Sequence, residues 1–247
     1  KLLYNRAFRA PGIENIDLNY YLNPQLNEPQ IKPEITNVYN AEIGYQINKN
    51  IYIVTNIFRI ALDNTIVYSI TETGTEGYDN LGKTGSQGIE LAIKTKFENV
   101  YFNCDYSFYT TKNMNEIDDY AIPDNDNLFL GAPQHKATVF TGIKISNKLN
   151  ANFSMIFFSK KYGYTTYNAA TDDVEIKEFP SIVLANLFIS YNDLIINGLN
   201  AGCGVYNLFN SDYQFVQPYN GWHSPVPGIS REFLVKLNYN FHWKGKK

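Results

Sequence analysis

The side chains in this sequence that are best suited to bind a ligand are aromatic. The chain has 20 Tyr, 16 Phe and 2 Trp, and aromatics make up 15% of its residues. Aromatic rings beside a few polar groups suit a bulky planar or glycan ligand. The candidate ligand-binding residues lie in long polar segments: Tyr20, Tyr21, Tyr164, Tyr219, Trp222 and His223. The competing interpretation is that Tyr and Asn are simply frequent in this protein.

Acidic residues and histidines suggest two further chemistries. Asp118-Asp119, Asp124 and Asp126 offer oxygen ligands of the kind that Ca²⁺ prefers. Their spacing lacks the Gly and Glu of an EF-hand loop, so a solvated loop is favoured. The histidines have no matching Asp-Asp or Asp-His pair at a strand end. The sequence therefore predicts no catalytic residue, no metal site and no cofactor.

Composition narrows the class of protein that carries these residues. The chain of 247 residues has 21 Lys+Arg and 24 Asp+Glu, and this net charge of −3 argues against a nucleic-acid partner. Charged residues make up 18%, below the roughly 25% of soluble domains. A run of about 18 apolar residues, which a membrane-spanning helix needs, is missing. Few charges, many aromatics and no such run are typical of a membrane β-barrel.

Alternation of apolar and polar residues predicts the strands that position these side chains. In 100–110, Phe102, Cys104, Tyr106 and Phe108 share one face, while Asn103 lies on the other. About ten such segments are present: 1–9, 38–47, 51–61, 87–97, 100–110, 134–145, 149–159, 181–191, 199–206 and 229–241. Cys104 and Cys203 fall on apolar faces of strands that are not neighbours, so no disulfide is expected between them.

Short and long connections alternate along the chain. The short ones are 48–50, 98–99, 146–148 and 192–198, and the long ones are 10–37, 62–86, 111–133, 160–180 and 207–228. Outer-membrane barrels have short periplasmic turns and long extracellular loops, whereas a soluble β-sandwich has no reason to place every long loop at one end. The sequence therefore predicts an all-β fold, a transmembrane antiparallel up-and-down β-barrel. Its first strand would run outward, and its C-terminus would be periplasmic.

Several motifs resemble those of the C-terminal part of TonB-dependent outer-membrane receptors. In order they are Phe8-Arg9-Ala10-Pro11, Asn23-Pro24-Gln25-Leu26, Lys32-Pro33-Glu34, Gly88-Ile89-Glu90-Leu91, Tyr206-Asn207-Leu208-Phe209-Asn210 and Pro227-Gly228-Ile229-Ser230-Arg231. Each motif alone is weak, but their order and spacing over the whole chain make the resemblance specific.

The resemblance implies a larger assembly. Members of this family carry a TonB box, a globular plug and a barrel of about 22 strands. Residues 1–241 are then expected to be the C-terminal part of the barrel, and 242–247 a short periplasmic tail. Nothing in the chain resembles a plug or a TonB box. Open sheet edges in lipid are costly, so the expected partners are the remaining strands and the plug, TonB through the missing N-terminal region, and outer-membrane lipid.

The resemblance also implies the function, which is uptake of a scarce ligand without chemistry on it. The ligand would be a siderophore, haem, cobalamin, a glycan or a peptide, recognised by extracellular loops in the cell outer membrane. For haem, the family's loop histidine is missing between Pro11 and Asn23. Tyr20 or Tyr21 could then supply a phenolate, or His223 an axial ligand.

Two other functions remain open on the sequence. A ten-stranded protease resembling the omptins is similar in length, and a passive porin or interaction scaffold would share the barrel. Barrel assembly would use the final strand, whose alternating apolar residues include Phe233, Tyr239 and Phe241. These three residues are the expected assembly signal, because an amphipathic strand with a free edge can pair with another strand.

Overall fold

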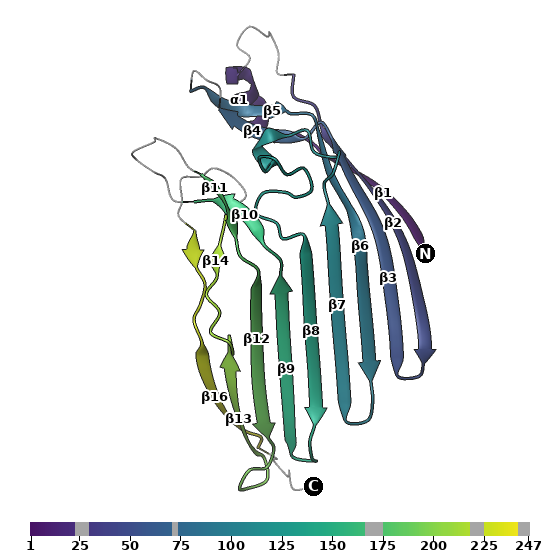
Figure 1. Cartoon of the computed structure of the whole chain (residues 1–247), viewed down its shortest axis with the longest axis vertical. Helices are drawn as coiled ribbons and strands as arrows, with labels where there is room; N and C mark the ends of the chain where they lie inside the picture. The colour runs from purple at the N-terminus through teal and green to yellow at the C-terminus, as the bar shows by residue number, and fades with distance from the viewer. Residues whose placement is uncertain (23–29, 71–73, 166–174, 218–224, 242–247) are drawn as a thin grey trace, which may run out of the picture. The chain divides into compact units, whose positions relative to one another are not determined.

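The computed structural model describes residues 1–22, 30–70, 74–165, 175–217 and 225–241. Within these ranges ten strands form one sheet, in the order β1-β2-β3-β6-β7-β8-β9-β12-β13-β16 (Figure 1). Their bounds are β1 Leu2–Arg9, β2 Glu34–Asn48, β3 Ile51–Asp63, β6 Lys83–Lys96, β7 Val100–Thr110, β8 His135–Lys144, β9 Leu149–Phe158, β12 Ile182–Tyr191, β13 Leu199–Tyr206 and β16 Glu232–Tyr239. The order follows the chain, which confirms the up-and-down topology.

All ten predicted segments form strands, but some boundaries differ. The strand predicted at 38–47 begins at Glu34, and the one predicted at 87–97 begins at Lys83. Both extensions lie in segments predicted as polar loops, and both are hydrogen-bonded to other loop residues. The Ile66 amide donates to Glu34 Oε2, and Thr84 Oγ1 donates to Asn115 Oδ1. The final strand is shorter than the predicted 229–241, since it spans Glu232–Tyr239.

The resolved registers divide the strands from β7 to β16 into an apolar and a polar face. Phe102 pairs with Thr141, Cys104 with Val139 and Phe108 with His135, and directly paired residues share a face. Followed across the sheet, the apolar face carries Phe102, Cys104, Tyr106, Phe108, Val139, Phe153, Met155, Phe157, Leu187, Ile189, Cys203, Val205, Phe233, Val235, Leu237 and Tyr239. The predicted lipid-facing side of 100–110 is therefore the apolar face. Cys104 and Cys203 are free and lie on strands that are not neighbours.

The polar face is lined by amides, hydroxyls and glycines. Tyr101 Oη donates to Asn152 Oδ1 at 2.9 Å, and Asn186 Nδ2 donates to Ser154 Oγ at 3.1 Å. The Tyr101 ring lies against Gly142, so a Cβ at that position would overlap it. The Phe188 ring covers Gly202 and Gly204 in the same way. Aromatic rings therefore lie along this wall instead of projecting from it.

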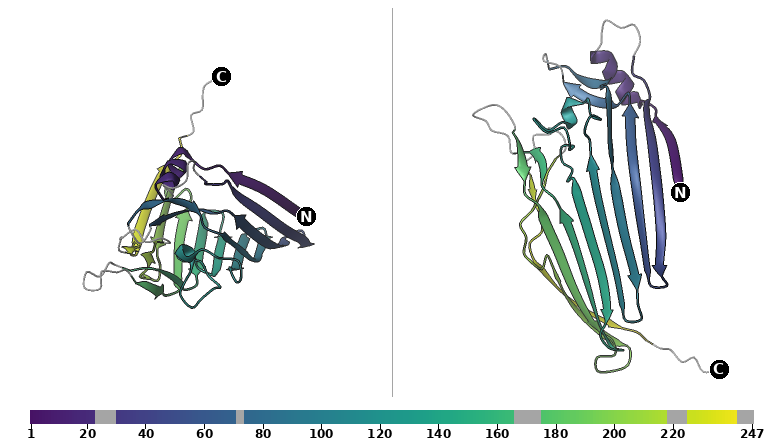
Figure 2. Two further views of the ribbon diagram at one scale, coloured as in Figure 1. Left: turned by 90° about the horizontal axis from the view of Figure 1, so that it is seen from above. Right: turned by 45° about the vertical axis from the view of Figure 1, so that its right-hand side comes forward.

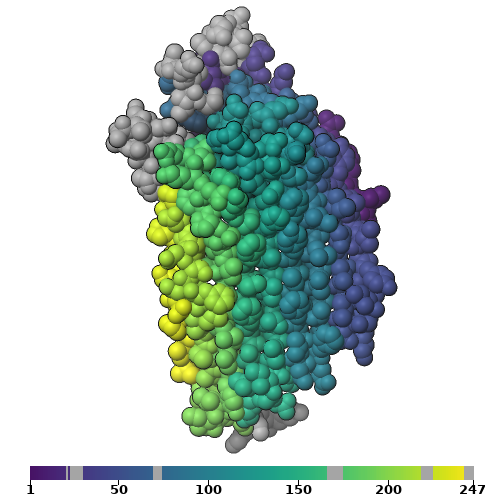
Figure 3. All heavy atoms as spheres, viewed as in Figure 1, coloured from purple at the N-terminus to yellow at the C-terminus, as the bar shows by residue number. Residues whose placement is uncertain are grey.

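The chain divides into two compact units. The first comprises 1–43, 56–89 and 109–132, and the second comprises 44–55, 90–108 and 133–247. In the second unit the short turns lie at one end of the strands, and the hairpin of β10 (Lys161–Tyr164) and β11 (Ile176–Phe179) lies at the other (Figure 2). The atoms of β8, β9 and β12 lie side by side in the teal-to-green part of the space-filling view (Figure 3). A further short pair is β14 (Gln214–Phe215) with β15 (Val226–Pro227).

The long connections of the first unit are folded, although the sequence predicts them only as polar loops. They contain helix α1 (Ile13–Leu22), the hairpin of β4 (Ile66–Ile70) and β5 (Glu76–Asn80), and the 3-10 turn η1 (Asp118–Tyr120). Gly77 on β5 lies against Leu18 and Leu22 of α1, and the buried Asn19 amide donates to the Tyr78 carbonyl at 2.8 Å. The buried apolar residues in these connections are Ile66, Val67, Ile117, Ile122, Leu128 and Leu130. These connections thus bury apolar side chains of their own.

Candidate ligand-binding site

One cavity in the described part of the first unit lies within the segment 111–128. It has a volume of about 410 Å³ and combines hydrogen-bonding with apolar side chains. The polar lining consists of Thr111, Asn113, Asn115, Asp124, Asn125 and Asp126, and the apolar lining of Ala121, Ile122 and Leu128. Amides offer both donors and acceptors, while carboxylates accept. The cavity can therefore bind a ligand rich in hydroxyl, amide or amine groups.

Hydrogen bonds within the segment fix the walls of this cavity. The buried Thr111 donates its hydroxyl to the Asp126 carbonyl at 2.8 Å, and its amide donates to the Asn127 carbonyl at 3.1 Å. Asn113 and Asp124 adopt left-handed backbone conformations, with φ of 57° and 61°. Asn and Asp tolerate this region better than other residues with a Cβ. The local sequence thus sets the turns that shape the cavity.

A second link joins the wall of the cavity to the neighbouring strand β6. Thr84 Oγ1 donates to Asn115 Oδ1 at 2.8 Å, and the Asn115 amide donates to the Ile117 carbonyl at 2.9 Å. The Glu116 backbone amide also donates to the Lys83 carbonyl, at 2.9 Å. These bonds hold the segment against a strand of the sheet and fix the positions of its polar groups.

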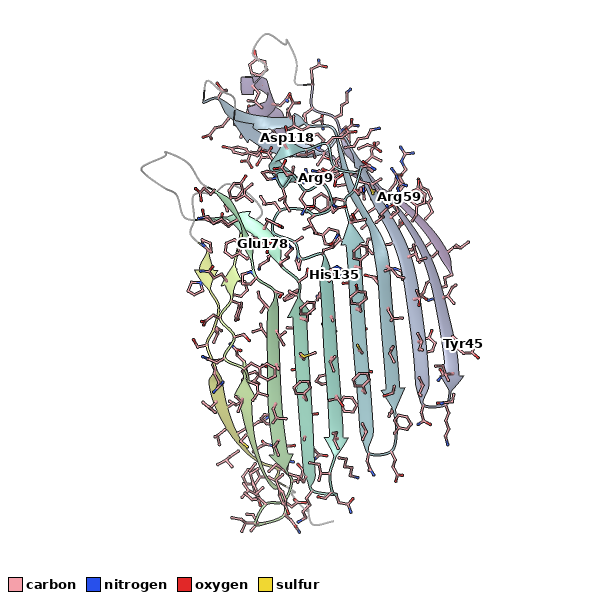
Figure 4. The ribbon with its side chains drawn as sticks, in the orientation of Figure 1. Arg9, Tyr45, Arg59, Asp118, His135 and Glu178 are labelled. Atoms are coloured by element: carbon pink, nitrogen blue, oxygen red, sulfur yellow. The ribbon has the colours of Figure 1, made fainter. Side chains whose placement is uncertain are left out.

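An ion pair ties the β4–β5 hairpin to the wall in the same unit. The Arg9 guanidinium lies 3.4 Å from Glu34 Oε2 and donates to the Ile66 carbonyl at 3.2 Å (Figure 4). The Ile66 amide donates to Glu34 Oε2 at 3.2 Å.

Two groups of the 3-10 turn η1 have shifted pKa values. Burial, and then the Glu34 charge, raise the pKa of Tyr120. Burial, and then the charge of Asp118, raise the pKa of Asp119.

The second unit presents a charged hairpin at the end of its strands. Glu178 on β11 accepts hydrogen bonds from Lys160 Nζ and from the Tyr162 hydroxyl, both at 2.7 Å (Figure 4). The hydrogen bond from Lys160, followed by the one from Tyr162, lowers the pKa of Glu178. The same contact with Glu178 raises the pKa of Lys160. This hairpin therefore offers a partly neutralised, hydrogen-bonded surface.

The predicted ligand-binding residues lie on separate elements or outside the described residues. Tyr20 lies on α1 and is 45% exposed, and Tyr164 lies on β10 opposite Ile176. Neither residue lines the cavity in 111–128. Tyr21 is the ninth residue of α1, but its side chain lies outside the described part, as do Tyr219, Trp222 and His223.

The amides that line the cavity are the residues that sequence reasoning missed. Only the carboxylates of this segment were recognised as candidate ligands, for Ca²⁺. Among the described residues, no group of three or more His, Cys, Asp and Glu side chains lies close enough to hold a metal ion. The signal that could have identified the site is the density of Asn and Asp between 113 and 127, because these side chains form turns through their own hydrogen bonds.

The expected assembly residues lie at the end of the described chain. Phe233 and Tyr239 are on the apolar face of β16, where they pair with Val205 and Leu199. The rings of Tyr239 and Phe241 meet edge to face, with centroids 4.5 Å apart. Phe233 and Phe241 are 77% and 86% exposed, as side chains that face lipid would be.

Most of the chain is similar in sequence to one known protein family. The sequence profile of the family described as "TonB dependent receptor-like, beta-barrel" matches residues 2–208. No curated protein matches the chain by sequence.

Several solved structures share the fold. One is the ferripyoverdine receptor of the outer membrane of Pseudomonas aeruginosa bound to ferripyoverdine, with a TM-score of 0.73 and 16% identity over 96% of this chain and 30% of that one. Another is the ferric-catecholate import receptor of K12 E. coli, with a TM-score of 0.70 and 18% identity over 97% and 33%. A third is a siderophore receptor of Acinetobacter baumannii, with a TM-score of 0.64 and 16% identity over 87% and 33%. The chain spans about a third of the length of these structures.

Proposed function

The chain belongs to the TonB-dependent receptor family, and from this we propose that it forms part of an outer-membrane receptor that imports a scarce ligand. The family consists of transporters and not of enzymes, so a protease resembling the omptins is set aside. The import itself would need the plug and TonB, which are the family's usual partners. The part played by these residues is ligand recognition and a share of the barrel wall.

The ligand that we favour is a ferric siderophore with several hydroxyl or amide groups. The observation that carries this choice is the cavity in 111–128, whose amide and carboxylate side chains can donate to and accept from such a ligand. The solved structures with the same fold include a receptor bound to ferripyoverdine and a ferric-catecholate import receptor.

A glycan is the second candidate. Phe129 follows Leu128 of the cavity lining and contacts two aromatic rings, with centroid distances of 6.3 Å to Tyr109 and 6.5 Å to Tyr120. A sugar ring can pack on an aromatic face while its hydroxyls bond to amides and carboxylates. The same lining would then serve a different cargo.

The orientation belongs to the same proposal. We place the short turns in the periplasm and the long connections outside, with 1–241 as the C-terminal part of the barrel and 242–247 as a periplasmic tail. What supports this is the length rule for outer-membrane barrels. Tyr20, Tyr21, Tyr164, Tyr219, Trp222 and His223 would then all face the exterior, where they could contact a ligand.

Uptake of radiolabelled iron by cells that produce the full-length receptor tests the proposal. Changing Asn115 and Asn125 to Ala removes two lining amides, and we expect weaker ferric siderophore binding, by about 5- to 100-fold for two lost hydrogen bonds. Asn147→Ala, in a short turn, is the matched control and should leave uptake unchanged. Normal iron uptake by the double variant, with weakened binding of an oligosaccharide, would favour the glycan instead.

A further inference from the structure

The short turn at 192–198, between β12 and β13, contains three consecutive apolar residues, Leu194, Ile195 and Ile196 (Figure 1). The other short turns contain only Asn, Lys, Glu and Ser, and they are 48–50, 98–99 and 146–148. The three apolar residues are 44%, 82% and 55% exposed. A contiguous exposed apolar patch marks a surface that contacts something other than water.

Hydrogen bonds within the turn fix its backbone. The Gly198 amide donates to Asp193 Oδ1 at 2.7 Å, and the Leu194 amide donates to the Leu199 carbonyl at 2.8 Å. The Leu199 amide closes the tip by donating to the Ile196 carbonyl at 3.1 Å. Asp193 and Gly198 adopt left-handed conformations, with φ of 52° and 91°. The apolar residues therefore stand on a defined backbone, with a left-handed corner on each side.

Two neighbouring segments attach this turn to the end of the sheet. Lys148, just before β9, donates from Nζ to the Asp193 carbonyl at 3.3 Å, and the Asn192 amide donates to the Lys148 carbonyl at 2.8 Å. On the other side, the Asn240 amide donates to the Gly198 carbonyl at 2.8 Å. A Cβ at Gly198 would lie only 2.6 Å from the Asn240 carbonyl oxygen. The turn is thus held between the start of β9 and the end of β16.

The turn is continuous with the apolar face of the second unit. Tyr191 lies on this face, two residues beyond Ile189 on β12. Tyr239 lies on it through its pair with Leu199, and the Tyr239 ring meets that of Phe241. Aromatic side chains thus form the last part of the apolar face before the turn. This position is typical of the aromatic girdle at a membrane interface.

The charges beside the turn are compatible with a phospholipid surface. The Asp193 carboxylate accepts a hydrogen bond from the Gly198 amide inside the turn. Lys148 places a positive charge beside the Asp193 carbonyl, and such a charge attracts the anionic headgroups of phospholipids. Apolar residues next to a cation and aromatic rings are typical of segments that lie in the membrane interface. Because the patch continues the apolar face, lipid is favoured over a protein partner.

We propose that Leu194, Ile195 and Ile196 insert among the phospholipid acyl chains of the leaflet at the end of the short turns and anchor this part of the wall. The proposal rests on the assignment of the apolar face to lipid, and in the proposed orientation this leaflet is the periplasmic one. The lipid-covered band then extends further along β12 and β13 than along β8 and β9, whose connecting turn, 146–148, is polar.

The test uses the full-length receptor in vesicles of phosphatidylethanolamine and phosphatidylglycerol, with an environment-sensitive fluorescent amino acid in place of Ile195. Its emission should shift to shorter wavelength, and phospholipids brominated in their acyl chains should quench it, because bromine quenches on contact. The same amino acid at Asn147, in the polar turn, is the matched control, and aqueous iodide should quench it instead. A probe at Val235, which is 77% exposed on the apolar face, gives the reference for contact with lipid.

Two further measurements separate lipid from protein and guard against misfolding. In a heat-modifiable, folded barrel, Leu194→Ser with Ile196→Ser should reduce bromine quenching at position 195, whereas Val at both positions should preserve it. A photoreactive amino acid at 195 in intact cells should form adducts with phospholipid.

The outcomes distinguish the anchor from the assignment on which it rests. Bromine quenching at 235 but not at 195 would overturn the anchor alone, and no quenching at either position would overturn the assignment of lipid to the apolar face as well. A photoadduct of position 195 with a protein, the plug included, would show that the patch binds a protein and would also overturn the proposal.

Discussion

Arg9 on β1 lies 3.4 Å from the carboxylate of Glu34 on β2, and both side chains bind the backbone of Ile66. One ion pair thus connects two strands of the wall with the first residue of the β4–β5 hairpin. The Glu34 side chain is 11% exposed, whereas the Arg9 side chain is 57% exposed. The carboxylate is the more deeply placed partner, and its loss would leave the Ile66 amide without an acceptor.

Glu34→Ala should loosen the β4–β5 hairpin without unfolding the barrel. A buried amide that loses its acceptor costs about 1–3 kcal/mol, or about 5- to 150-fold in local opening. Hydrogen exchange of residues 64–70 and 76–82 measures this opening. Glu76→Gln is the control within the same hairpin. Among the described residues, Glu76 accepts a side-chain hydrogen bond only from the exposed Tyr68 hydroxyl. Equal protection in Glu34→Ala and the wild type would show that the ion pair does not hold the hairpin.

The two faces of β7 should respond differently to a charge. Phe102→Arg places a guanidinium on the apolar face and should destabilise the folded barrel by about 2–4 kcal/mol if it lies near the bilayer midplane. Asn103→Arg, on the polar face, is the matched control and should cost much less. Urea unfolding of the full-length receptor in lipid vesicles measures both. Similar losses for the two variants would contradict the assignment of lipid to the apolar face.

The long connections should be accessible from outside the cell. A protease added to intact cells is expected to cut within 111–133, 160–180 and 207–228 and to spare 98–99 and 146–148. Detection of the fragments by mass spectrometry measures this, and cells with permeabilised outer membranes are the control. Cleavage of the short turns in intact cells would reverse the proposed topology.

Acid should weaken the β10–β11 hairpin through Glu178. Since the hydrogen bonds from Lys160 and Tyr162 lower its pKa in the folded state, its contribution is present above the ordinary pKa of Glu. That contribution is lost as the pH falls through the lowered pKa. Protection factors of residues 161–164 and 176–179 should therefore fall on acidification. Glu178→Gln should remove this pH dependence, whereas the neighbouring Glu175→Gln should keep it.

The last described residues should matter for assembly. Phe241→Asp places a charge next to the Tyr239 ring, at the end of the apolar face of β16, and should reduce the amount of folded barrel. Deletion of 244–247 should leave assembly nearly unchanged, because these residues follow the strand. Heat modifiability on gels measures folded barrel in the outer membrane. If Trp243→Asp is defective while Phe241→Asp assembles normally, the end of the strand lies two residues further on.

The sheet was predictable from the sequence, whereas the site was not. Alternation at period two identifies strands such as 100–110 because lipid on one side and polar groups on the other impose opposite demands on successive residues. Helix α1 and the β4–β5 hairpin do not lie between lipid and a polar interior, so their sequences do not alternate in this way. Their structure depends on contacts such as Gly77 with Leu18 and Asn19 with Tyr78, which join residues about 60 positions apart. Short-range sequence patterns do not predict such long-range contacts.

The candidate residues illustrate the same division. Tyr20 and Tyr164 were chosen for their chemistry, and each lies on an element that the sequence did not reveal. The cavity instead uses Asn113, Asn115 and Asn125, whose positions follow from turns and from the bond between Thr84 and Asn115. Residue type alone identified the kinds of groups that could bind, and tertiary structure determined which of them meet.

Gly142 beneath Tyr101, and Gly202 and Gly204 beneath Phe188, let these rings lie close to the polar face of the sheet. A ring that lies flat over Gly142, or over Gly202 and Gly204, adds about its own thickness to the wall, whereas an upright ring would project by most of its length. An alanine at any of these positions would lift the ring and narrow the passage in front of it. If the polar face lines the lumen, as proposed, the absence of a Cβ at these three glycines would widen the bore of the complete barrel.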